Sequence, residues 1–528
     1  MFKPYLTRSV AAAALLAASV GMAGAQVVIN RGNDTDPATL DHHKTSTVSE
    51  SRVLKDLYEG LVIQDAKAEV VPGAAESWTI SDDGLTYTFK LREDGKWSNG
   101  DPVTAQDFEF AFRRIMTPAT AAGYASVLFA IVNAEAVTKG DKQPEELGVR
   151  AVDDHTFEIT LNQPTPYFLE LLTHQTGLPM HKASVEAHGD QFTRAGNLVT
   201  NGAYMLDSFA PNDKMVMKKN PNFYDADSVQ IDVVNWIPFE DRSACMRRFE
   251  AGEVQICPDV AAEQMDYVKA NLGDQFRLAP YLGVYYLPVK GADGGPLKDA
   301  RVRKAISLVI DREFIASQVW RDTMLPGYSL VPPGIANYVE PAPQLDFKDK
   351  DILDREDEAK ALLAEAGVAD GSLTVQLNYN TSENHRNTMA AIADQLGSIG
   401  IKATLNEMEG SSYFNYMRED GAFDLARAGW IGDYNDPQNF LMLAETGVSF
   451  NYARWSNADY DALMKKAEAT LDLDERAKVL AEAETLFLTE EPFIPIMYYS
   501  STNLVADNVA GFEDNIMNVH MSRFLSLN

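Results

Sequence analysis

Long apolar runs are missing from most of this sequence. After the first 25 residues no stretch approaches about 18 uninterrupted apolar residues, so we expect no transmembrane helix. The chain of 528 residues also has no low-complexity tract and no repeat of fixed period. About 500 residues remain after the first 25, which is more than one hydrophobic core usually organises, so two or three domains are expected.

Positive charge is scarce in this chain. It has 46 Lys and Arg residues against 77 Asp and Glu residues, which gives a formal net charge of −31 at pH 7. A chain this acidic repels phosphate backbones and anionic lipid surfaces, so we expect no nucleic-acid partner. Solubility at high concentration accounts for the charge, and we infer nothing about a ligand from it.

Motifs of the common enzyme classes are absent. The sequence has no Gly-x-Ser-x-Gly elbow, no His-Glu-x-x-His helix, no Walker phosphate loop and no Gly-x-Gly-x-x-Gly dinucleotide loop. His42 and His43 form the only close histidine pair, and adjacent side chains point to different faces. We interpret the pair as a solvated loop and predict no metal site. The sequence indicates no cofactor and predicts a protein that is not an enzyme.

Only two cysteines are present, Cys245 and Cys257. Residues 242–251 are predicted to form a helix and 253–257 a strand, and a disulfide would require the two to fold back on each other. An exported location permits such a bond. The sequence leaves the question of a Cys245–Cys257 disulfide open.

The first 25 residues have the features of a signal peptide. Lys3 and Arg8 supply a basic start, and residues 10–20 supply an apolar run too short to span a membrane. Residues 23–25, Ala-Gly-Ala, form a small-residue cleavage site, so the mature chain is expected to begin at Gln26. Because no cysteine lies near this cut, we expect a freely diffusing exported protein without a lipid anchor.

Hydrophobic periodicity changes character along the chain. The first third is rich in strands, with predicted pairs at 78–80 with 87–91 and at 149–152 with 157–161, and a helix that begins at Thr104. After residue 285, predicted helices at 303–310, 356–366, 386–396 and 475–486 alternate with predicted strands at 373–377, 401–405 and 425–430. Such alternation indicates an α/β lobe with a mostly parallel sheet. A cleft between lobes is the usual place for a ligand.

The segment DLARAGWIGDYNDPQNFL at 424–441 carries the most informative pattern. It is predicted to form a strand at 424–430 that breaks at Gly432, with Pro437 starting a helix. If the strand runs on, Arg427 and Asp433 share one face and lie at most roughly 20 Å apart. A short zwitterion fits between two such charges. The alternative is a β–α connection whose Arg and Asp only face water.

This segment resembles the aspartate-containing ligand loop of the periplasmic oligopeptide-binding proteins (extracellular solute-binding protein family 5), the solute receptors of peptide ABC importers. Further motifs that resemble this family, in the family's order, are LYEGL at 57–61, WSNGDPVT at 97–104, NGAY at 201–204, NPNFY at 220–224, DARVRKA at 299–305, EAKALLAEAG at 358–367 and YNTS at 379–382. Together they cover nearly all of the chain after the leader.

The resemblance implies an α/β fold similar to the type II periplasmic binding proteins, with two lobes around a hinge and an extra inserted domain. The expected division is a signal peptide at 1–25, a discontinuous domain I at 26–59, 184–282 and 501–528, a domain II at 60–183, and a domain III at 283–500. Some relatives carry a cysteine pair, and the matching positions here are Gly283 and Ile431, so that bridge is absent.

The resemblance also implies ligand contacts. Asp433 matches the aspartate that holds the N-terminal amine of the peptide. The residues that match contacts to peptide C-termini, at distances that vary with peptide length, are Arg418, Arg427 and His385. Those that match backbone pairing with the peptide, in the manner of an added strand, are Ser46, Thr47, Val48, Gly429, Trp430 and Ile431. Candidate pocket walls are Tyr124, Tyr286 and Tyr499, although aromatic rings are equally common in cores.

These expectations describe a monomeric receptor in the periplasm. It captures short peptides of roughly two to five residues and delivers them to the permease subunits of an ABC importer. Two alternatives stay open. One is a receptor for murein peptide or for another small solute of the same family. The other is an exported peptide hydrolase whose catalytic residues are distant in sequence.

Overall fold

The computed structural model describes residues 26–45, 47–239, 241–260, 262–291, 295–408, 413, 416–417, 419 and 421–528. The predicted signal peptide at 1–25 and the candidate contacts Ser46 and Arg418 lie outside these residues. Within the described ranges, no helix is both long enough and apolar enough to cross a membrane.

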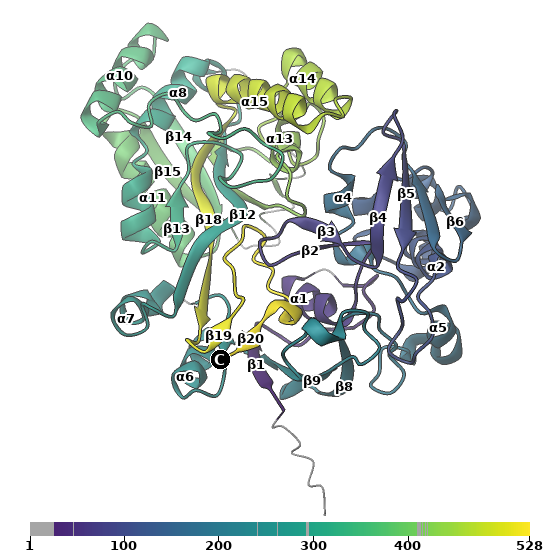
Figure 1. The fold of residues 1–528 in the computed structure, drawn as a ribbon. Helices are drawn as coiled ribbons and strands as arrows, with labels where there is room; N and C mark the ends of the chain where they lie inside the picture. The colour runs from purple at the N-terminus through teal and green to yellow at the C-terminus, as the bar shows by residue number, and fades with distance from the viewer. Residues whose placement is uncertain are drawn as a thin grey trace, which may run out of the picture.

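A nine-stranded sheet runs through the molecule (Figure 1). Its two longest strands, β12 (Phe276–Pro288) and β18 (Phe493–Val505), pair antiparallel over most of their length. Most of β18 and the second half of β12 are buried, as expected for apolar runs that are covered on both faces. Figure 1 shows both strands rising from the lower part of the molecule into the helical part at upper left.

The other strands of this sheet are short. Along the main path the order is β17-β12-β18-β11-β1-β10-β9-β8, and β13 pairs with β18 beside it. Their bounds are β1 (Val28–Asn33), β8 (Tyr204–Ala210), β9 (Lys214–Lys219), β10 (Val233–Pro238), β11 (Ile256–Cys257), β13 (Met324–Pro326) and β17 (Ala428–Ile431).

The end of the chain returns to the region of β1. Arg31 in β1 donates a hydrogen bond to Ser522 Oγ over 2.7 Å, and the backbone nitrogen of Ser522 donates to Asp56 Oδ1 over 2.7 Å. Asp56 belongs to helix α1 (Val48–Leu57), and all three residues are buried. The C-terminal segment, with β19 (Val509–Ala510) and β20 (Ser526–Leu527), is therefore an integral part of the N-terminal region.

A separate four-stranded sheet forms the part on the right of Figure 1. Its order is β4-β5-β7-β6, with bounds β4 (Ala75–Ile80), β5 (Thr86–Leu91), β6 (Val149–Asp153) and β7 (Thr156–Thr160). Both predicted strand pairs are confirmed. Helix α2 (Ala105–Met116) begins after Thr104, which forms a capping box with Asp107, as the sequence predicted.

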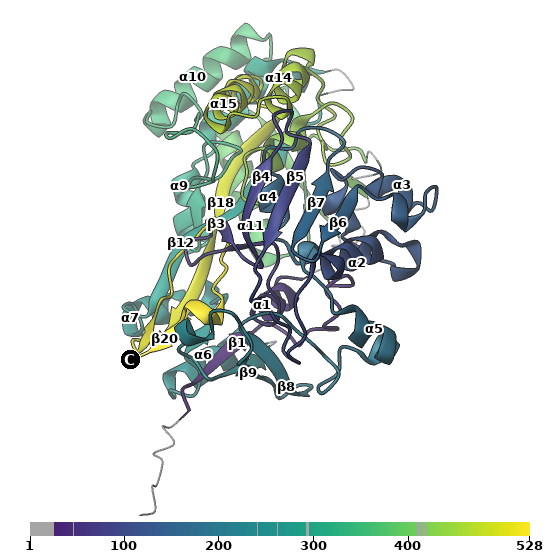
Figure 2. The ribbon, with the colours of Figure 1, turned by 45° about the vertical axis from the view of Figure 1, so that its right-hand side comes forward.

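Helices and a parallel sheet make up the part at upper left of Figure 1, and Figure 2 shows it from a second side. The parallel strands are β14 (Thr374–Asn380), β15 (Lys402–Met408) and β16 (Leu425–Ala426). The main helices are α8 (Ala300–Val309), α10 (Ile352–Glu365), α11 (Glu383–Gly397), α14 (Ala458–Glu468) and α15 (Leu473–Glu490). The predicted helix–strand alternation is confirmed to within a few residues at most boundaries.

Shorter elements connect these parts. They are the helices α3 (Ala134–Thr138), α4 (Phe168–Leu171), α5 (Lys182–His188), α6 (Arg242–Glu250), α7 (Met265–Asn271), α9 (Arg312–Phe314) and α13 (Gln438–Leu441), and the hairpin of β2 (Val62–Gln64) with β3 (Val70–Pro72).

Buried apolar side chains gather in separate clusters. The largest takes its members from residues 282–516, and the second takes most of its members from residues 29–256. Tyr434 is an exception, because it follows the predicted ligand residue Asp433 in sequence but packs in the second cluster. The division into domains I, II and III at the boundaries given above stays a prediction.

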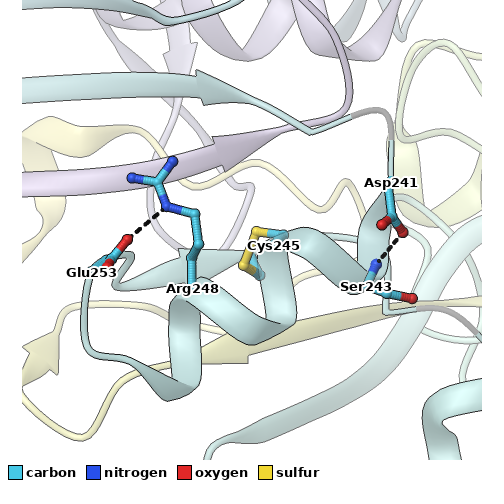
Figure 3. Close-up of a disulfide and its surroundings, with 6 residues drawn as sticks. Asp241, Ser243, Cys245, Arg248 and Glu253 are labelled. Atoms are coloured by element: carbon cyan, nitrogen blue, oxygen red, sulfur yellow. Dashed lines mark hydrogen bonds and ion pairs between the residues drawn. A yellow bond between two sulfur atoms is a disulfide. The ribbon is translucent and has the colours of Figure 1, made fainter.

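The two cysteines are joined by a disulfide (Figure 3). Cys245 lies in α6 and Cys257 in β11, with their Cα atoms 5.9 Å apart. Asp241 caps the start of α6 by accepting a hydrogen bond from the backbone nitrogen of Ser243 over 2.9 Å. The helix and strand fold back on each other, which resolves the question that the sequence left open.

The interpretation of His42 and His43 as a solvated pair is wrong. Their exposed fractions are 0% and 1%, and their rings meet edge to face with centroids 4.5 Å apart. Asp41, just before them, forms an ion pair with Arg114 over 2.7 Å, which fixes the turn against α2. Burial lowers the pKa of His42 to about 4, so its imidazole is neutral. Across the described ranges, no group of three or more His, Cys, Asp or Glu side chains is arranged to hold a metal ion.

Candidate ligand cleft

A cavity of about 340 Å³ opens where distant parts of the chain meet. Its wall includes one face of α1, residues 173–175 after α4, residues 431–433 at the end of β17, and residues 517–521 near the end of the chain. Helix α1 lies near the middle of the molecule in both views (Figures 1 and 2). A concave site built from several segments is the usual form of a small-molecule site.

Helix α1 supplies one wall of this cavity. Val48, Ser51, Arg52 and Lys55 line it, and their spacing of three or four residues places them on one face of the helix. The opposite face of α1 carries buried apolar residues, including Leu54, that anchor the helix in the second cluster. The amphipathic pattern of α1 therefore presents polar side chains to the cavity.

The start of α1 lies at the edge of the cavity. Thr47 Oγ1 accepts a hydrogen bond from the backbone nitrogen of Glu50 over 3.3 Å, and Thr47 N donates to Glu50 Oε2 over 3.1 Å. Thr47 has extended backbone, whereas Val48 is the first residue of the helix. Within the described part of the predicted 46–48 contact segment, only Thr47 thus has the backbone of a strand, and Ser46 lies outside the described residues.

The predicted strand before Asp433 is divided between two sheets. β16 pairs in parallel with β14, and β17 pairs antiparallel with β12, so the chain changes sheets at Arg427. The strand ends before Gly432, and α13 follows Pro437. The prediction of a strand, a break at Gly432 and a helix after Pro437 is confirmed.

β17 forms one edge of the nine-stranded sheet. The backbone nitrogen of Gly432 donates to Leu282 O over 2.8 Å, which fixes the phase of the antiparallel ladder. By the alternation of such a ladder, Trp430 bonds to β12, while Gly429 and Ile431 direct their N–H and C=O groups away from it. An edge of this kind can accept an extended peptide as an added strand.

Gly283 and Ile431 face each other across β12 and β17. A Cβ atom on Gly283 would come within 2.5 Å of Ile431 Cδ1, so the glycine leaves the room that the isoleucine side chain fills. The positions at which some relatives carry a cysteine pair are therefore cross-strand neighbours in this chain.

Asp433 lines the cavity directly after the edge strand. Its side chain is exposed. No residue in the described ranges donates a hydrogen bond to its carboxylate or forms an ion pair with it. The protein around it withholds part of its hydration, which raises its pKa. Burial, followed by the charge of Asp433, raises the pKa of the nearby Tyr124 hydroxyl. An uncompensated carboxylate in a cleft suits a cationic group of a ligand.

Buried contacts fix the Asp433 loop from behind. Asp436 accepts two hydrogen bonds from Arg476 in α15, both over 2.7 Å, and the exposed fractions of the two side chains are 0% and 1%. Tyr434 stacks on Tyr167, with ring centroids 5.1 Å apart and planes 6° apart. Tyr167 directly precedes α4, so the loop is attached to the opposite side of the cleft as well.

Only one of the predicted pocket walls lines this cavity. Tyr124 does, and it stacks on His174 with centroids 5.6 Å apart. Tyr286 is buried in the core against Phe493, with centroids 5.0 Å apart. Tyr499 lies outside the cavity wall and accepts a hydrogen bond from Arg427. An aromatic residue buried on β12 and one that lines a cleft have the same local sequence pattern. The two roles can therefore be told apart only from the burial of the side chain in the structure.

Arg427 and His385 lie together around the Tyr285 ring, and neither lines the cavity. Arg427 Nη2 donates to Tyr499 Oη over 2.9 Å, and its guanidinium lies 5.0 Å from the ring centre of Tyr285. No described residue gives Arg427 a carboxylate partner, and its buried Nε has no hydrogen-bond acceptor. His385 packs 5.6 Å from the same Tyr285 ring. Burial, followed by the charge of Arg427, lowers the pKa of His385 to about 3, so the imidazole is neutral.

Several residues of the cavity wall were not identified from the sequence. They are Ser51, Arg52, Lys55, Thr173, His174, Gln175, Gly432, Tyr281 and residues 517–521. The helical spacing of 48, 51, 52 and 55 is a signal that marks one face of α1. The contributions of 173–175 and 517–521 carry no such signal, because irregular segments reach the cavity only through the packing of whole regions. Arg476 is likewise 40 positions from its partner Asp436.

An open cleft between lobes, an edge strand and an unpaired carboxylate are features of a protein that binds a solute. The profile of the bacterial extracellular solute-binding proteins, family 5 Middle, matches residues 69–452. The chain belongs to this family.

Curated relatives match over almost their whole length. The periplasmic oligopeptide-binding protein OppA of Salmonella typhimurium is 37% identical over 525 residues, which covers 98% of this chain and 95% of that protein. Among solved structures, the unliganded open form of the murein tripeptide binding protein MppA is 33% identical with a TM-score of 0.89, and the match covers 96% of this chain and 98% of that one. The predicted fold class is confirmed by this similarity.

A peptide complex is also similar. Haemophilus influenzae OppA in complex with RPPGFSPFR is 35% identical with a TM-score of 0.73, and the match covers 96% of this chain and 99% of that one. The TM-score with the open, unliganded structure is higher at a comparable sequence identity. The arrangement of this chain therefore resembles an open form.

Proposed function

We propose that this chain is an exported receptor that captures short peptides, of roughly two to five residues, in its cleft and delivers them to an ABC importer. The observation that carries the proposal is Asp433, a cavity carboxylate to which no described protein group is paired. It follows directly on an edge strand whose residues Gly429 and Ile431 direct backbone groups outward. Together they complement the ammonium group and the main chain that every free peptide offers.

Arg427 and His385, with Arg418, are proposed to receive the C-terminal carboxylate. The free Nε of Arg427 supports this role, because a buried guanidinium that lacks a carboxylate is suited to bind one. His385 would act as a neutral hydrogen-bond donor, since burial keeps its imidazole uncharged. Arg427 directly precedes β17, the strand that leads to Asp433, and His385 in α11 packs against the same Tyr285 ring as Arg427.

The receptor role also includes movement of whole lobes. We propose domain I at 26–59, 184–282 and 501–528, domain II at 60–183 and domain III at 283–500, with β12 and β18 crossing from one lobe to the next. Bending of these strands would close the cleft on a peptide, and the closed form would dock on the permease. The protein would act as a monomer in the periplasm, after removal of residues 1–25, and would carry out no covalent chemistry.

The names of relatives support peptides as the ligands. The Salmonella typhimurium relative is an oligopeptide-binding protein, and the Haemophilus influenzae structure holds a nonapeptide. A murein peptide is the second candidate, because the structure with a TM-score of 0.89 is that of a murein tripeptide binding protein. An exported hydrolase is less well supported, since the family profile is that of solute-binding proteins.

Native mass spectrometry of the protein purified from the periplasm tests the proposal. We expect adducts whose masses match short peptides, and tandem spectra will distinguish murein peptides from general ones. Peptides added to the stripped protein should be recovered intact after incubation. Cleaved peptides would instead indicate a hydrolase, and a stripped protein that binds no peptide of any length would contradict the receptor role.

A further inference from the structure

The cavity wall carries more charge than Asp433. Two cations from α1, Arg52 and Lys55, also line it. Arg52 is neutralised within the protein, because its guanidinium lies 3.5 Å from Asp34 and 3.2 Å from Asp259. Lys55 forms no ion pair with any described residue, so the two cations differ in what they can offer a ligand.

Lys55 is held in place by an uncharged partner. Its ammonium donates to Gln64 Oε1 over 2.6 Å, which uses one of its three donors. Burial lowers the pKa of Lys55 to about 8, so the ammonium form still predominates at pH 7. Glu170 is a nearby carboxyl, but burial, followed by repulsion from Asp436, raises its pKa to about 8. Glu170 is therefore mainly neutral at pH 7 and does not cancel the charge of Lys55.

The remaining titratable groups of the cavity do not supply a counter-charge. His174 stacks on Tyr124, and its Nδ1 lies 2.9 Å from Thr176 Oγ1. His520 stacks on Phe512 with centroids 3.7 Å apart. Burial lowers the pKa of each imidazole to about 3, so both are neutral. Among the described residues, the unpaired charges on the cavity wall are thus one acid, Asp433, and one base, Lys55.

We propose that Lys55 binds a carboxylate of the ligand, and that the cleft therefore favours peptides with an acidic side chain. The inference rests on the proposed function, since it concerns the ligand of the same cavity. Arg427 and His385 lie outside the cavity wall and are proposed for the peptide C-terminus, which leaves Lys55 for a second carboxylate. A charge-assisted hydrogen bond to an ammonium is roughly twice as strong as a neutral one, so it can select between otherwise equal peptides.

Isothermal titration of matched tripeptides tests this inference. The mature protein, stripped of bound peptide, is titrated with alanine tripeptides that carry Glu or its neutral isostere Gln at the first, second or third position. In the wild type we expect the Glu peptide to bind about tenfold more tightly at one of these positions. Lys55→Met should remove that preference, with a larger loss of affinity for the Glu peptide than for the Gln peptide.

Two further variants control for folding and for general charge. Lys55→Gln keeps a hydrogen-bonding group without the charge and should lose the preference as well. Lys44→Met removes an exposed lysine that does not line the cavity, and this variant should keep the preference for the Glu peptide. Melting temperatures identify any variant that has failed to fold.

A second comparison shows whether Lys55 binds the C-terminal carboxylate or the acidic side chain. Trialanine and its C-terminal amide are titrated into the wild type and Lys55→Met. Suppose that Lys55→Met changes the ratio of the affinities for trialanine and its amide, but not the ratio for the Glu and Gln peptides. Lys55 then binds the C-terminus, and the proposed side-chain preference is overturned. An equal Glu-to-Gln ratio in wild type and variant, with neutral peptides still binding, contradicts only the role of Lys55. Failure of every peptide to bind contradicts the proposed function itself.

Discussion

At the scale of single residues, Asp433 differs from the buried acids Asp436 and Asp41. Asp436 has Arg476, and Asp41 has Arg114, at 2.7 Å each, whereas Asp433 has no cation. A carboxylate kept unpaired in a cleft loses hydration without an internal gain. Its charge becomes useful only when a ligand brings an ammonium group.

Asp433→Asn should weaken the binding of free-amine peptides while leaving the fold intact. The expected loss is roughly 1.5–3 kcal/mol, or about 10- to 150-fold in affinity, because one hydrogen bond to a charged group is removed. Calorimetry with a tripeptide and its N-acetylated form measures it. The wild type should discriminate strongly between the two forms and the variant only weakly, and equal binding of both forms by the wild type would falsify the role of Asp433.

The same carboxylate predicts a pH dependence of binding. Surrounding protein raises the pKa of Asp433, so its charge is present above that pKa and is lost as the pH falls through it. The affinity for free-amine peptides should therefore decrease as the pH falls toward the acid range. Titrations at a series of pH values on the wild type and Asp433→Asn test this, and a parallel decrease in both proteins would place the titrating group elsewhere.

At the scale of elements, alternate residues of the edge strand β17 direct their backbone groups toward β12 and away from it. Ile431 N–H points away from β12, whereas Trp430 N–H bonds to it. Ile431→Pro should therefore remove a donor to the ligand at small cost to the sheet, because proline is tolerated at an outward position of an edge strand. Trp430→Pro should break a ladder bond and destabilise the protein.

Thermal unfolding and peptide titration of the two proline variants distinguish these effects. We expect Ile431→Pro to keep its melting temperature within a few degrees of the wild type and to lose up to about tenfold in peptide affinity. Trp430→Pro should melt clearly lower. An Ile431→Pro protein that folds and binds peptides as the wild type does would show that β17 does not pair with the ligand backbone.

The loop after β17 depends on one buried ion pair. Arg476→Met should cost about 3–5 kcal/mol of unfolding free energy, since it leaves the Asp436 carboxylate buried without its cation. Asp436→Asn combined with Arg476→Met should recover part of that loss, because the uncompensated charge is then gone. Denaturant unfolding of the single and double variants measures both. A single variant as stable as the wild type would mean that the pair does not hold the loop.

At the scale of the whole molecule, ligand binding should raise the melting temperature. A ligand that binds only the native state stabilises it by about 2.7 kcal/mol at a concentration of 100 Kd. The shift should occur with tripeptides and tetrapeptides and not with free amino acids, which cannot bridge the charges of the cleft. The protein must first be freed of endogenous peptide by reversible denaturation, since a filled cleft hides the effect. No shift across a diverse peptide library would argue against the receptor.

Local features of this chain were predictable from its sequence. The capping box at Thr104, the hairpins of β4 with β5 and β6 with β7, and the strand that breaks at Gly432 all depend on neighbouring residues. The place of Asp433 in the cavity followed from the resemblance of its loop. For the capping box and the hairpins, the deciding interactions lie within a few positions of one another along the chain.

Burial and long-range partners were not predictable in the same way. His42 and His43 were expected in solvent, but an ion pair to Arg114, more than 70 positions away, buries the turn that carries them. Tyr286 has the same local pattern as a cleft aromatic, and only the packing of β12 against β18 places it in the core. Arg427 was predicted to contact the ligand, which stays a prediction, and its contacts with Tyr285 and Tyr499 could not be read from the local sequence.

The span of the cavity wall along the chain affects when the site can exist. Its members run from Thr47 to Met521, so the first and the last come from almost opposite ends of the polypeptide. Because the chain is synthesised from its N-terminus, α1 is made well before residues 517–521. A partly synthesised chain therefore lacks that part of the wall. The wall of the cavity is complete only after residues 517–521 have joined the folded chain.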